Sequence, residues 1–239
     1  MLHRILSAAA DFNPTLFWEY RAALIPGLLY NFYVFFLTVG VAIGLGFVGG
    51  ALRLSHNSVA RGAAGIYAEV CRNTPEYIAL IWIYYVPPIL IGKALGWNVS
   101  LPPVLAAVIA LGLSSSGYFV ETVRAGILAV PRGHLEAAAA LGMSRGLSLR
   151  RIVLPQAVRH MAPETMNQLV SLFKGTTLVS LIAVPDLMYR VSLVSMDTDR
   201  AVPLYSDAAV TFFIVVFAMT YAARALGRQR RHRLRMSDR

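Results

Sequence analysis

Long uncharged stretches alternate with short polar ones along this chain of 239 residues. No charged residue lies between Arg21 and Arg53, and none lies between Lys93 and Glu121. Each stretch exceeds the roughly 20 residues that a helix needs to cross a bilayer. Because backbone in lipid must satisfy its own hydrogen bonds, the pattern predicts an all-α protein that crosses a membrane several times.

Five transmembrane helices are predicted from these stretches. In chain order they cover residues 24–52, 77–91, 103–123, 163–184 and 206–225. A helix from about Ala63 leads into the second span. The fourth span is the least apolar, since Glu164 and Lys174 interrupt it. Composition agrees with a membrane protein, because only 14% of the residues are charged, whereas a soluble domain has about 25%.

The distribution of charge predicts the orientation. The chain has 22 lysines and arginines and a net charge of +10. If the carboxyl end is cytoplasmic, sixteen of these 22 lie on the cytoplasmic side, in agreement with the positive-inside rule. We therefore expect the amino end outside. The expected parts are an outer segment 1–23, a transmembrane domain 24–225 with a cytoplasmic loop 124–162, and a basic cytoplasmic tail 226–239.

The basic tail and the single cysteine, Cys71, exclude some classes of function. One cysteine cannot form an internal disulfide. No stacking aromatic side chains accompany the arginines of the tail, so we expect them to contact anionic lipid headgroups and expect no nucleic-acid partner.

The cytoplasmic loop has the local signals of two short helices joined by a turn. Pro131 suits a first helical turn, and alanine, the best helix former, dominates residues 135–141. Gly142 suits a left-handed cap, and Ser144 can cap a second helix, which we expect to end before Pro155. Such a helix–turn–helix either docks its small alanine surface into a partner's groove or rests on lipid as an amphipathic connector.

A motif in this loop resembles the EAA motif of the membrane subunits of bacterial ABC importers. Glu136-Ala137-Ala138 is followed after three residues by Gly142, after nine more by Ile152, and after one more by Leu154-Pro155. The resemblance implies the fold of an ABC importer type I permease, in which this loop forms a coupling helix seated in a cleft of the ATP-binding subunit. The implied coupling residues are Glu136, Ala137, Ala138, Leu141, Gly142 and Arg145.

Four further segments are similar to the polar amino acid uptake branch of that family, which includes histidine, glutamine and glutamate permeases. Residues 67–75 resemble its YxExxRxTP stretch, 115–126 its NSGAYxAExxRGG region, 154–159 its LPQAxR stretch and 174–178 its KDTSL stretch. The similarity covers roughly residues 27–225.

Three positions depart from the family pattern. His134 stands where the family often has glutamine, and Glu76 begins EYIA where LLVQ usually follows TP. Gly175 replaces the aspartate of KDTS. These departures leave the transporter class unchanged and bear on the substrate.

The resemblance implies a permease subunit of an ATP-driven amino-acid importer in the bacterial inner membrane. Its implied partners are a dimer of ATP-binding subunits, a second permease subunit (identical or a sister chain), a periplasmic solute-binding protein, the amino-acid substrate and the lipid bilayer. The chain lacks GxxxxGK[ST], so we expect no enzyme activity and no cofactor in it, with ATP and Mg bound by the partner subunit.

Polar side chains inside the predicted spans are candidates for the translocation path, because burying them in lipid is costly. They are Ser114, Ser115, Ser116, Glu121, Asn167, Lys174, Thr176 and Thr177. The serines also suit close helix packing. Lys174 suits either the carboxylate of a zwitterionic substrate or an ion pair with Glu121.

Two other functions remain open at this stage. One is an ABC permease for another small solute, such as an opine or other amino-acid derivative. The second is a secondary transporter that couples ions through Glu121 and Lys174, although such folds usually show paired inverted repeats, which this sequence lacks.

Overall fold

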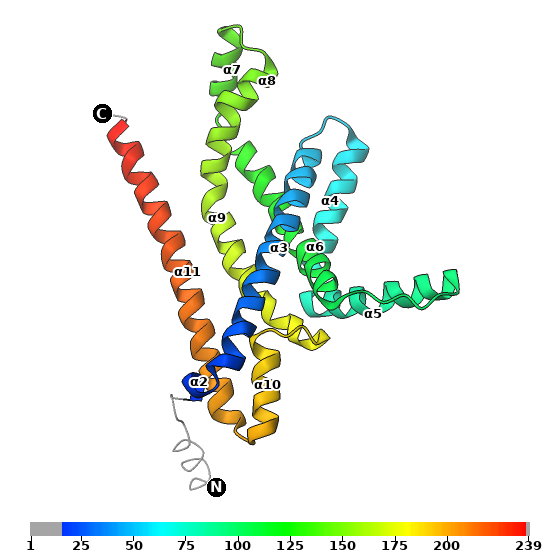
Figure 1. Cartoon of the computed structure of the whole chain (residues 1–239). Coiled ribbons are helices and arrows are strands. Elements are labelled where there is room, and N and C mark those ends of the chain that lie inside the picture. Colours follow the sequence, from blue (N-terminus) through cyan, green and yellow to red (C-terminus); the bar gives the residue numbers. More distant parts are fainter. Residues whose placement is uncertain (1–15, 238–239) are drawn as a thin grey trace. The chain divides into compact units, whose positions relative to one another are not determined.

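The computed structural model describes residues 16–237, and this part of the chain is built from helices without any strand (Figure 1). In chain order the helices are α2 (Leu16–Glu19), α3 (Arg21–Arg53), α4 (Ser58–Asn73), α5 (Glu76–Leu95), α6 (Pro103–Leu128), α7 (Arg132–Ala140), α8 (Arg145–Ser148), the π-helix η1 (Leu149–Val153), α9 (Leu154–Gly175), the 3₁₀-helix η2 (Thr176–Ile182), α10 (Leu187–Thr198) and α11 (Ala201–Ser237).

Four of these helices are long and apolar enough to cross a membrane by themselves. They are α3, α5, α6 and residues 201–225 of α11, and each contains one of the predicted spans. A fifth span arises if residues 145–182 and α10, which meet at a bend of 47°, cross together. The prediction of about five transmembrane helices is therefore confirmed as four or five.

The predicted fourth span, residues 163–184, is not one regular α-helix. It contains the end of α9 and the tighter turns of η2. Three hydroxyls there donate hydrogen bonds to carbonyl oxygens three residues earlier: Thr176 to Phe173, Thr177 to Lys174 and Ser180 to Thr177. Side-chain bonds of this local kind compete with regular helix hydrogen bonding.

The chain folds into two compact units. The first takes in the residues up to Thr38 together with Glu76–Leu111 and Leu172–Met219. The second takes in Val39–Pro75, Gly112–Ser171 and the residues from Thr220 onward. Each unit is described by itself below.

An aromatic cluster around Phe173 forms part of the core of the first unit. The ring of Phe173 is fully buried, and its centroid lies 4.9 Å from that of Phe32, 5.6 Å from that of Phe35 and 6.0 Å from that of Phe212. A second group of buried residues in this unit consists of Leu24, Leu187, Val191, Leu204 and Ala208. Tilted and edge-to-face aromatic pairs, such as those of Phe173, contribute about 0.5–1.5 kcal/mol each beyond the burial of their area.

A glycine face on α3 permits close helix packing in the second unit. Gly46, Gly49 and Gly50 recur at the spacing of one helix face. A Cβ at Gly50 would lie 2.6 Å from Cγ1 of Val123 and 3.2 Å from the carbonyl oxygen of Val120. A Cβ at Gly46 or Gly49 would contact Phe119 or Val120 still more closely. Small residues at such contacts are the usual means by which membrane helices approach one another.

Replacing Gly50 with alanine should therefore destabilise the protein. We expect a loss of about 1–3 kcal/mol, because one added methyl overpacks a contact whose partners include backbone. Gly44→Ala on the same helix is the matched control, since a Cβ there meets no atom within 4 Å. Thermal unfolding of both variants purified in detergent measures the effect. Equal melting temperatures for the two variants would show that α3 and α6 do not pack at Gly50.

Candidate functional site

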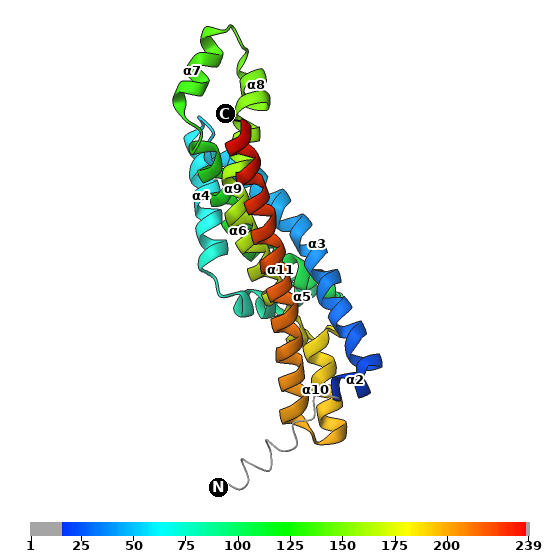
Figure 2. The same ribbon diagram turned by 90° about the vertical axis from the view of Figure 1, so that its left-hand side faces the viewer.

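The loop that carries the EAA motif is a helix–turn–helix with capped helix ends. Helices α7 and α8 lie beyond the start of α9, and Figures 1 and 2 show them as two short arms joined by a turn. Two backbone hydrogen bonds close the end of α7: Gly142 N–H donates to the carbonyl of Ala139, and Met143 N–H donates to that of Ala138. This pair of bonds is the Schellman motif, which satisfies the free carbonyls at the end of a helix.

The predicted capping residues of this loop are confirmed. Gly142 has φ +72°, in the left-handed region that disfavours side chains. The hydroxyl oxygen of Ser144 accepts a hydrogen bond from the backbone N–H of Leu147 and so caps α8. Pro131 precedes the first residue of α7. These features depend on neighbouring residues only, and this explains why the sequence revealed them.

The prediction that the second helix ends before Pro155 is wrong. The chain stays helical from α8 through η1 and into α9, with Pro155 as the second residue of α9. Proline lacks an N–H and its ring collides with the carbonyl four residues earlier in a regular α-helix. Here the turn is widened, and Leu154 N–H donates to the carbonyl of Leu149, five residues earlier. The π turn accommodates Pro155 without ending the helix, and such turns are frequent at functional sites.

A small buried cluster and one side-chain bond fix the base of this loop. Val130, Val153 and Ala157 form the cluster, with Ile127 packed against it. His134 Nδ1 lies 2.9 Å from Oε1 of Gln156, whose Nε2 donates to a backbone carbonyl. Because Oε1 can only accept, His134 must donate from Nδ1. This bond ties α7 to α9.

The six predicted coupling residues divide into an exposed and a buried set. The exposed ones are Glu136, Ala137, Leu141, Gly142 and Arg145. Leu141 is the extreme case, an apolar side chain that is 80% exposed at the tip of the turn. Ala138 is 1% exposed and lies inside the loop. The loop therefore presents a small apolar surface that nothing in the described residues covers.

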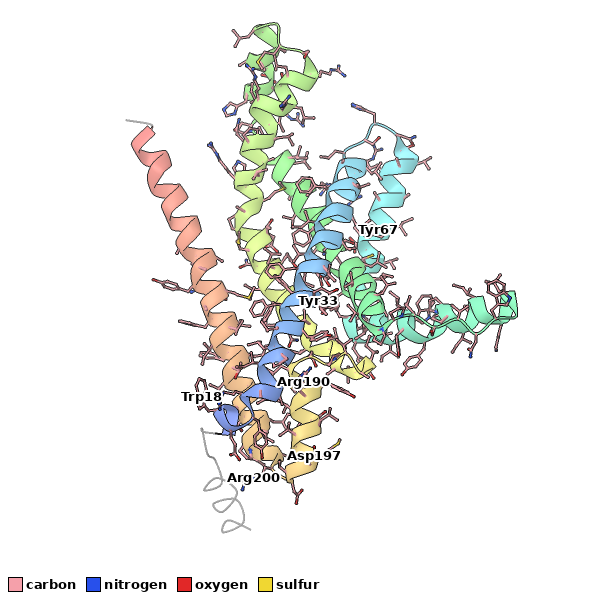
Figure 3. All side chains as sticks on the ribbon, in the orientation of Figure 1. Trp18, Tyr33, Tyr67, Arg190, Asp197 and Arg200 are labelled. Atoms are coloured by element: carbon pink, nitrogen blue, oxygen red, sulfur yellow. The ribbon has the colours of Figure 1, made fainter. Side chains whose placement is uncertain are left out.

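The second unit also gathers two of the other motifs. Ser116 on α6 lies 2.6 Å from the hydroxyl of Tyr67 on α4 (labelled in Figure 3). Ser116 donates its single hydroxyl hydrogen to the carbonyl of Leu113, so Tyr67 is the donor between the two. A Cβ at Gly117 would lie 2.8 Å from the carbonyl oxygen of Ala68. The Tyr67 segment and the Ser115 segment thus pack together as neighbouring helices.

Glu121 is held by two arginines rather than left free. One carboxylate oxygen lies 3.0 Å from Nη2 of Arg53, and the other lies 3.3 Å from Nη1 of Arg124. All three side chains are partly buried. Arg53 also passes close to Gly65, where a Cβ would lie 2.7 Å from its Nη1. Sequence reasoning named Glu121 but did not identify Arg53 as its partner, which is 68 residues away.

The remaining candidates in the second unit differ in burial. Ser114 and Ser115 are buried on α6, whereas Asn167 is exposed on α9. Among the described residues, no three His, Cys, Asp or Glu side chains gather closely enough to hold a metal ion.

Thr176 in the first unit belongs to a buried polar network. Nδ2 of Asn31 donates to the carbonyl and to the hydroxyl of Thr176 and to Oδ2 of Asp186, at 3.3, 3.2 and 3.1 Å. Oδ1 of Asn31 accepts from the backbone N–H of Leu187 at 3.1 Å. Asp186 also caps α10 through Tyr189 N–H. Sequence reasoning missed Asn31 here, although an amide inside an otherwise apolar span was a signal.

Lys174 has an exposed side chain, and it forms no ion pair with the side chains of residues 18–225 that the structure describes. The carboxylate of Glu121, which sequence reasoning offered as a partner, is bound by Arg53 and Arg124 instead. Thr177, three residues after Lys174, is half-buried, and its hydroxyl donates to the carbonyl of Lys174.

Comparison with known proteins shows the family. A probable glutamine ABC transporter permease of Bacillus subtilis is 30% identical over 219 residues, which cover 90% of this chain and 97% of the relative. An arginine transport system permease of Corynebacterium glutamicum is 35% identical over 191 residues, which cover 75% of this chain and 59% of the relative.

The fold has a solved counterpart in the crystal structure of an amino acid ABC transporter with histidines. Its matching chain is 29% identical and has a TM-score of 0.81, with 92% of this chain and 98% of that chain covered. The predicted all-α fold of an ABC importer type I permease is thereby confirmed. The family model described as "Binding-protein-dependent transport system inner membrane component" matches residues 28–232. The chain belongs to this family of membrane components of binding-protein-dependent transport systems.

Proposed function

We propose that this chain is the permease subunit of an ATP-driven importer of polar amino acids. The names of its relatives, which are permeases for glutamine and arginine, support the amino-acid class. The observation that carries the ATP-driven mechanism is the capped helix–turn–helix with its exposed alanine and leucine surface. Such a surface can transmit a displacement of the partner subunit, because the Schellman motif fixes the end of α7 and the serine cap fixes the start of α8.

The partner at this surface is the ATP-binding subunit. Glu136, Ala137, Leu141, Gly142 and Arg145 are exposed and contact it, while Ala138 supports the turn from within. His134 and Gln156 hold α7 against α9, so a displacement of α7 moves α9. The chain itself binds neither ATP nor Mg.

The other partners follow from the family. A second permease subunit, identical or a sister chain, completes the pathway, and a periplasmic solute-binding protein delivers the amino acid. The chain lies in the bacterial inner membrane with its amino end outside and its carboxyl end inside. In this orientation residues 1–23 are periplasmic, 24–225 form the transmembrane domain with the cytoplasmic loop 124–162, and the basic residues 226–239 face anionic lipid headgroups. Residues 1–15 and 238–239 lie outside the described part of the chain.

Lys174 binds the carboxylate of the amino acid on its path. Its ammonium group is exposed and forms no ion pair within the part of the chain that the structure describes, and an unpaired charge in a membrane span is costly unless it serves a ligand. Ser114, Ser115, Ser116, Glu121, Asn167, Thr176 and Thr177 are the other candidates along the path. Of these, Ser116, Glu121 and Thr176 have protein partners and act through helix packing.

Gly142→Val should release the ATP-binding subunit, because valine in the left-handed region is strained by roughly 1–2 kcal/mol and the turn must reshape. Gly142→Asn should retain more of it, since asparagine tolerates this backbone conformation. The measurement is the amount of ATP-binding subunit that co-purifies with the tagged chain. Gly62→Val is the control, because a Cβ at this exposed glycine of α4 meets no atom within 4 Å.

Two outcomes would contradict this coupling role. Wild-type chain that retains no ATP-binding subunit would reopen the secondary-transporter hypothesis. Equal retention by Gly142→Val and by the control would place the contact elsewhere on the chain.

Lys174→Met should lower the ATP-dependent uptake of amino acid into proteoliposomes by about tenfold or more, because a charge-assisted hydrogen bond to the substrate is lost. Lys93→Met makes the same change at an exposed lysine of α5 in the same unit and should leave uptake unchanged. Wild-type uptake by Lys174→Met would refute the role of this side chain.

A further inference from the structure

Two departures from the family pattern that lie 99 positions apart in the sequence meet in the first unit. Glu76 is the first residue of α5, and Gly175 is the last residue of α9. A Cβ built on Gly175 would lie 2.8 Å from Oε2 of Glu76 and 3.8 Å from its Cδ. The carboxylate of Glu76 therefore occupies the place where a side chain of residue 175 would begin.

The backbone does not require glycine at position 175. Its φ of −60° and ψ of −25° belong to the right-handed helical region, which any residue adopts. Apart from Glu76, the nearest atom to the missing Cβ is Cδ2 of Leu111 at 3.9 Å, an ordinary contact. The Glu76 carboxylate is thus the neighbour that a side chain at 175 would displace.

An aspartate at 175, as in the family's KDTS stretch, would place a second carboxylate beside Glu76. The steric conflict alone is mild, because Oε2 ends a flexible side chain. The repulsion of two carboxylates at this distance is the stronger obstacle. Glycine at 175 and glutamate at 76 therefore depend on each other.

Glu76 and Lys174 carry opposite charges that are not neutralised by the protein. Glu76 is half-buried, and neither a hydrogen bond nor an ion pair engages its carboxylate within residues 18–225, whose side chains the structure describes. Lys174 adjoins Gly175 and is equally unpaired there, and the two side chains form no ion pair with each other. Free charges of both signs beside one end of α9 suit a ligand that carries both, since leaving them unpaired in a membrane span is costly.

We propose that Glu76 supplies, from α5, the carboxylate that the family pattern supplies from position 175, and that it binds the α-ammonium group of the amino-acid substrate. Lys174 then binds the substrate's carboxylate. This inference rests on the proposed function, because it specifies how the imported amino acid is held.

A purely structural role for Glu76 makes different predictions. A carboxylate in the first turn of a helix interacts favourably with the free N–H groups there. In that role Glu76→Gln would lower thermal stability only slightly and leave uptake intact. In that role a carboxylate at position 175 would not replace Glu76. Residue 175 is the last residue of α9 and does not lie in the first turn of α5.

The test uses the complete transporter in proteoliposomes, with ATP and substrate-loaded binding protein. The probe is whichever of radiolabelled L-glutamine, L-arginine or L-histidine the wild type imports. Glu76→Gln should lower the uptake rate by about tenfold or more, and Gly175→Asp should do so as well. The double variant Glu76→Ala with Gly175→Asp should recover uptake to within about threefold of the wild type, because it restores a single carboxylate at the same place.

Glu164→Gln is the matched control, since it removes one carboxylate from an exposed position on α9 and should import at the wild-type rate. Co-purification of the ATP-binding subunit and size-exclusion profiles verify that each variant assembles. Normal uptake by Glu76→Gln, or a double variant no better than Gly175→Asp alone, would overturn this inference while leaving the importer itself intact. Absence of ATP-dependent uptake by the wild type would instead refute the proposed function.

Discussion

A break in a helical run leaves backbone groups without helical partners, which is costly wherever water cannot reach them, and this chain has a break between Ile182 and Leu187. Ala183 adopts a left-handed conformation with φ 58°. Nδ2 of Asn31 donates to the carbonyl of Thr176, the first residue of η2, and Oδ1 of Asn31 accepts from the backbone N–H of Leu187 after the break. Arg190 donates to the carbonyls of Pro185 and Ala23, and Figure 3 shows it on α10 beside α3. Asn31 of α3 and Arg190 of α10 thus bond two backbone groups at the break, the N–H of Leu187 and the carbonyl of Pro185.

The same requirement explains the glycine that α3 places beside that break. A Cβ at Gly27 would lie 2.7 Å from Cδ of Arg190 and 2.8 Å from the carbonyl oxygen of Asp186, so there is no room for a side chain at this position of α3. The polar network is complete only because α3 approaches this closely. Hydrogen bonding of the buried polar groups and tight helix packing are therefore one constraint in this unit, since hydrogen bonds of about 3 Å need helices without intervening side chains.

The loop that carries the EAA motif meets a different requirement, which in the proposed function is mechanical. A loop that transmits force must have few internal degrees of freedom, and here both helix ends are capped and α7 is tied to α9 by His134 and Gln156. The π turn η1 keeps α8 continuous with α9 in spite of Pro155. A conventional break before the proline would have left a hinge at this point. The helix that begins at this loop ends at Gly175, the residue that makes room for Glu76.

The sequence by itself determined the features that depend on neighbouring residues. These include the apolar spans, the left-handed Gly142 and the Ser144 cap, because hydropathy and capping act over a few residues. Only the tertiary structure decided which distant polar groups meet: Arg53 with Glu121, Asn31 with Asp186, and Glu76 with Gly175. It also decided that Pro155 lies within a helix. The contacts between distant residues depend on helix packing, and the helical position of Pro155 depends on relaxation of the backbone. A single stretch of sequence encodes neither.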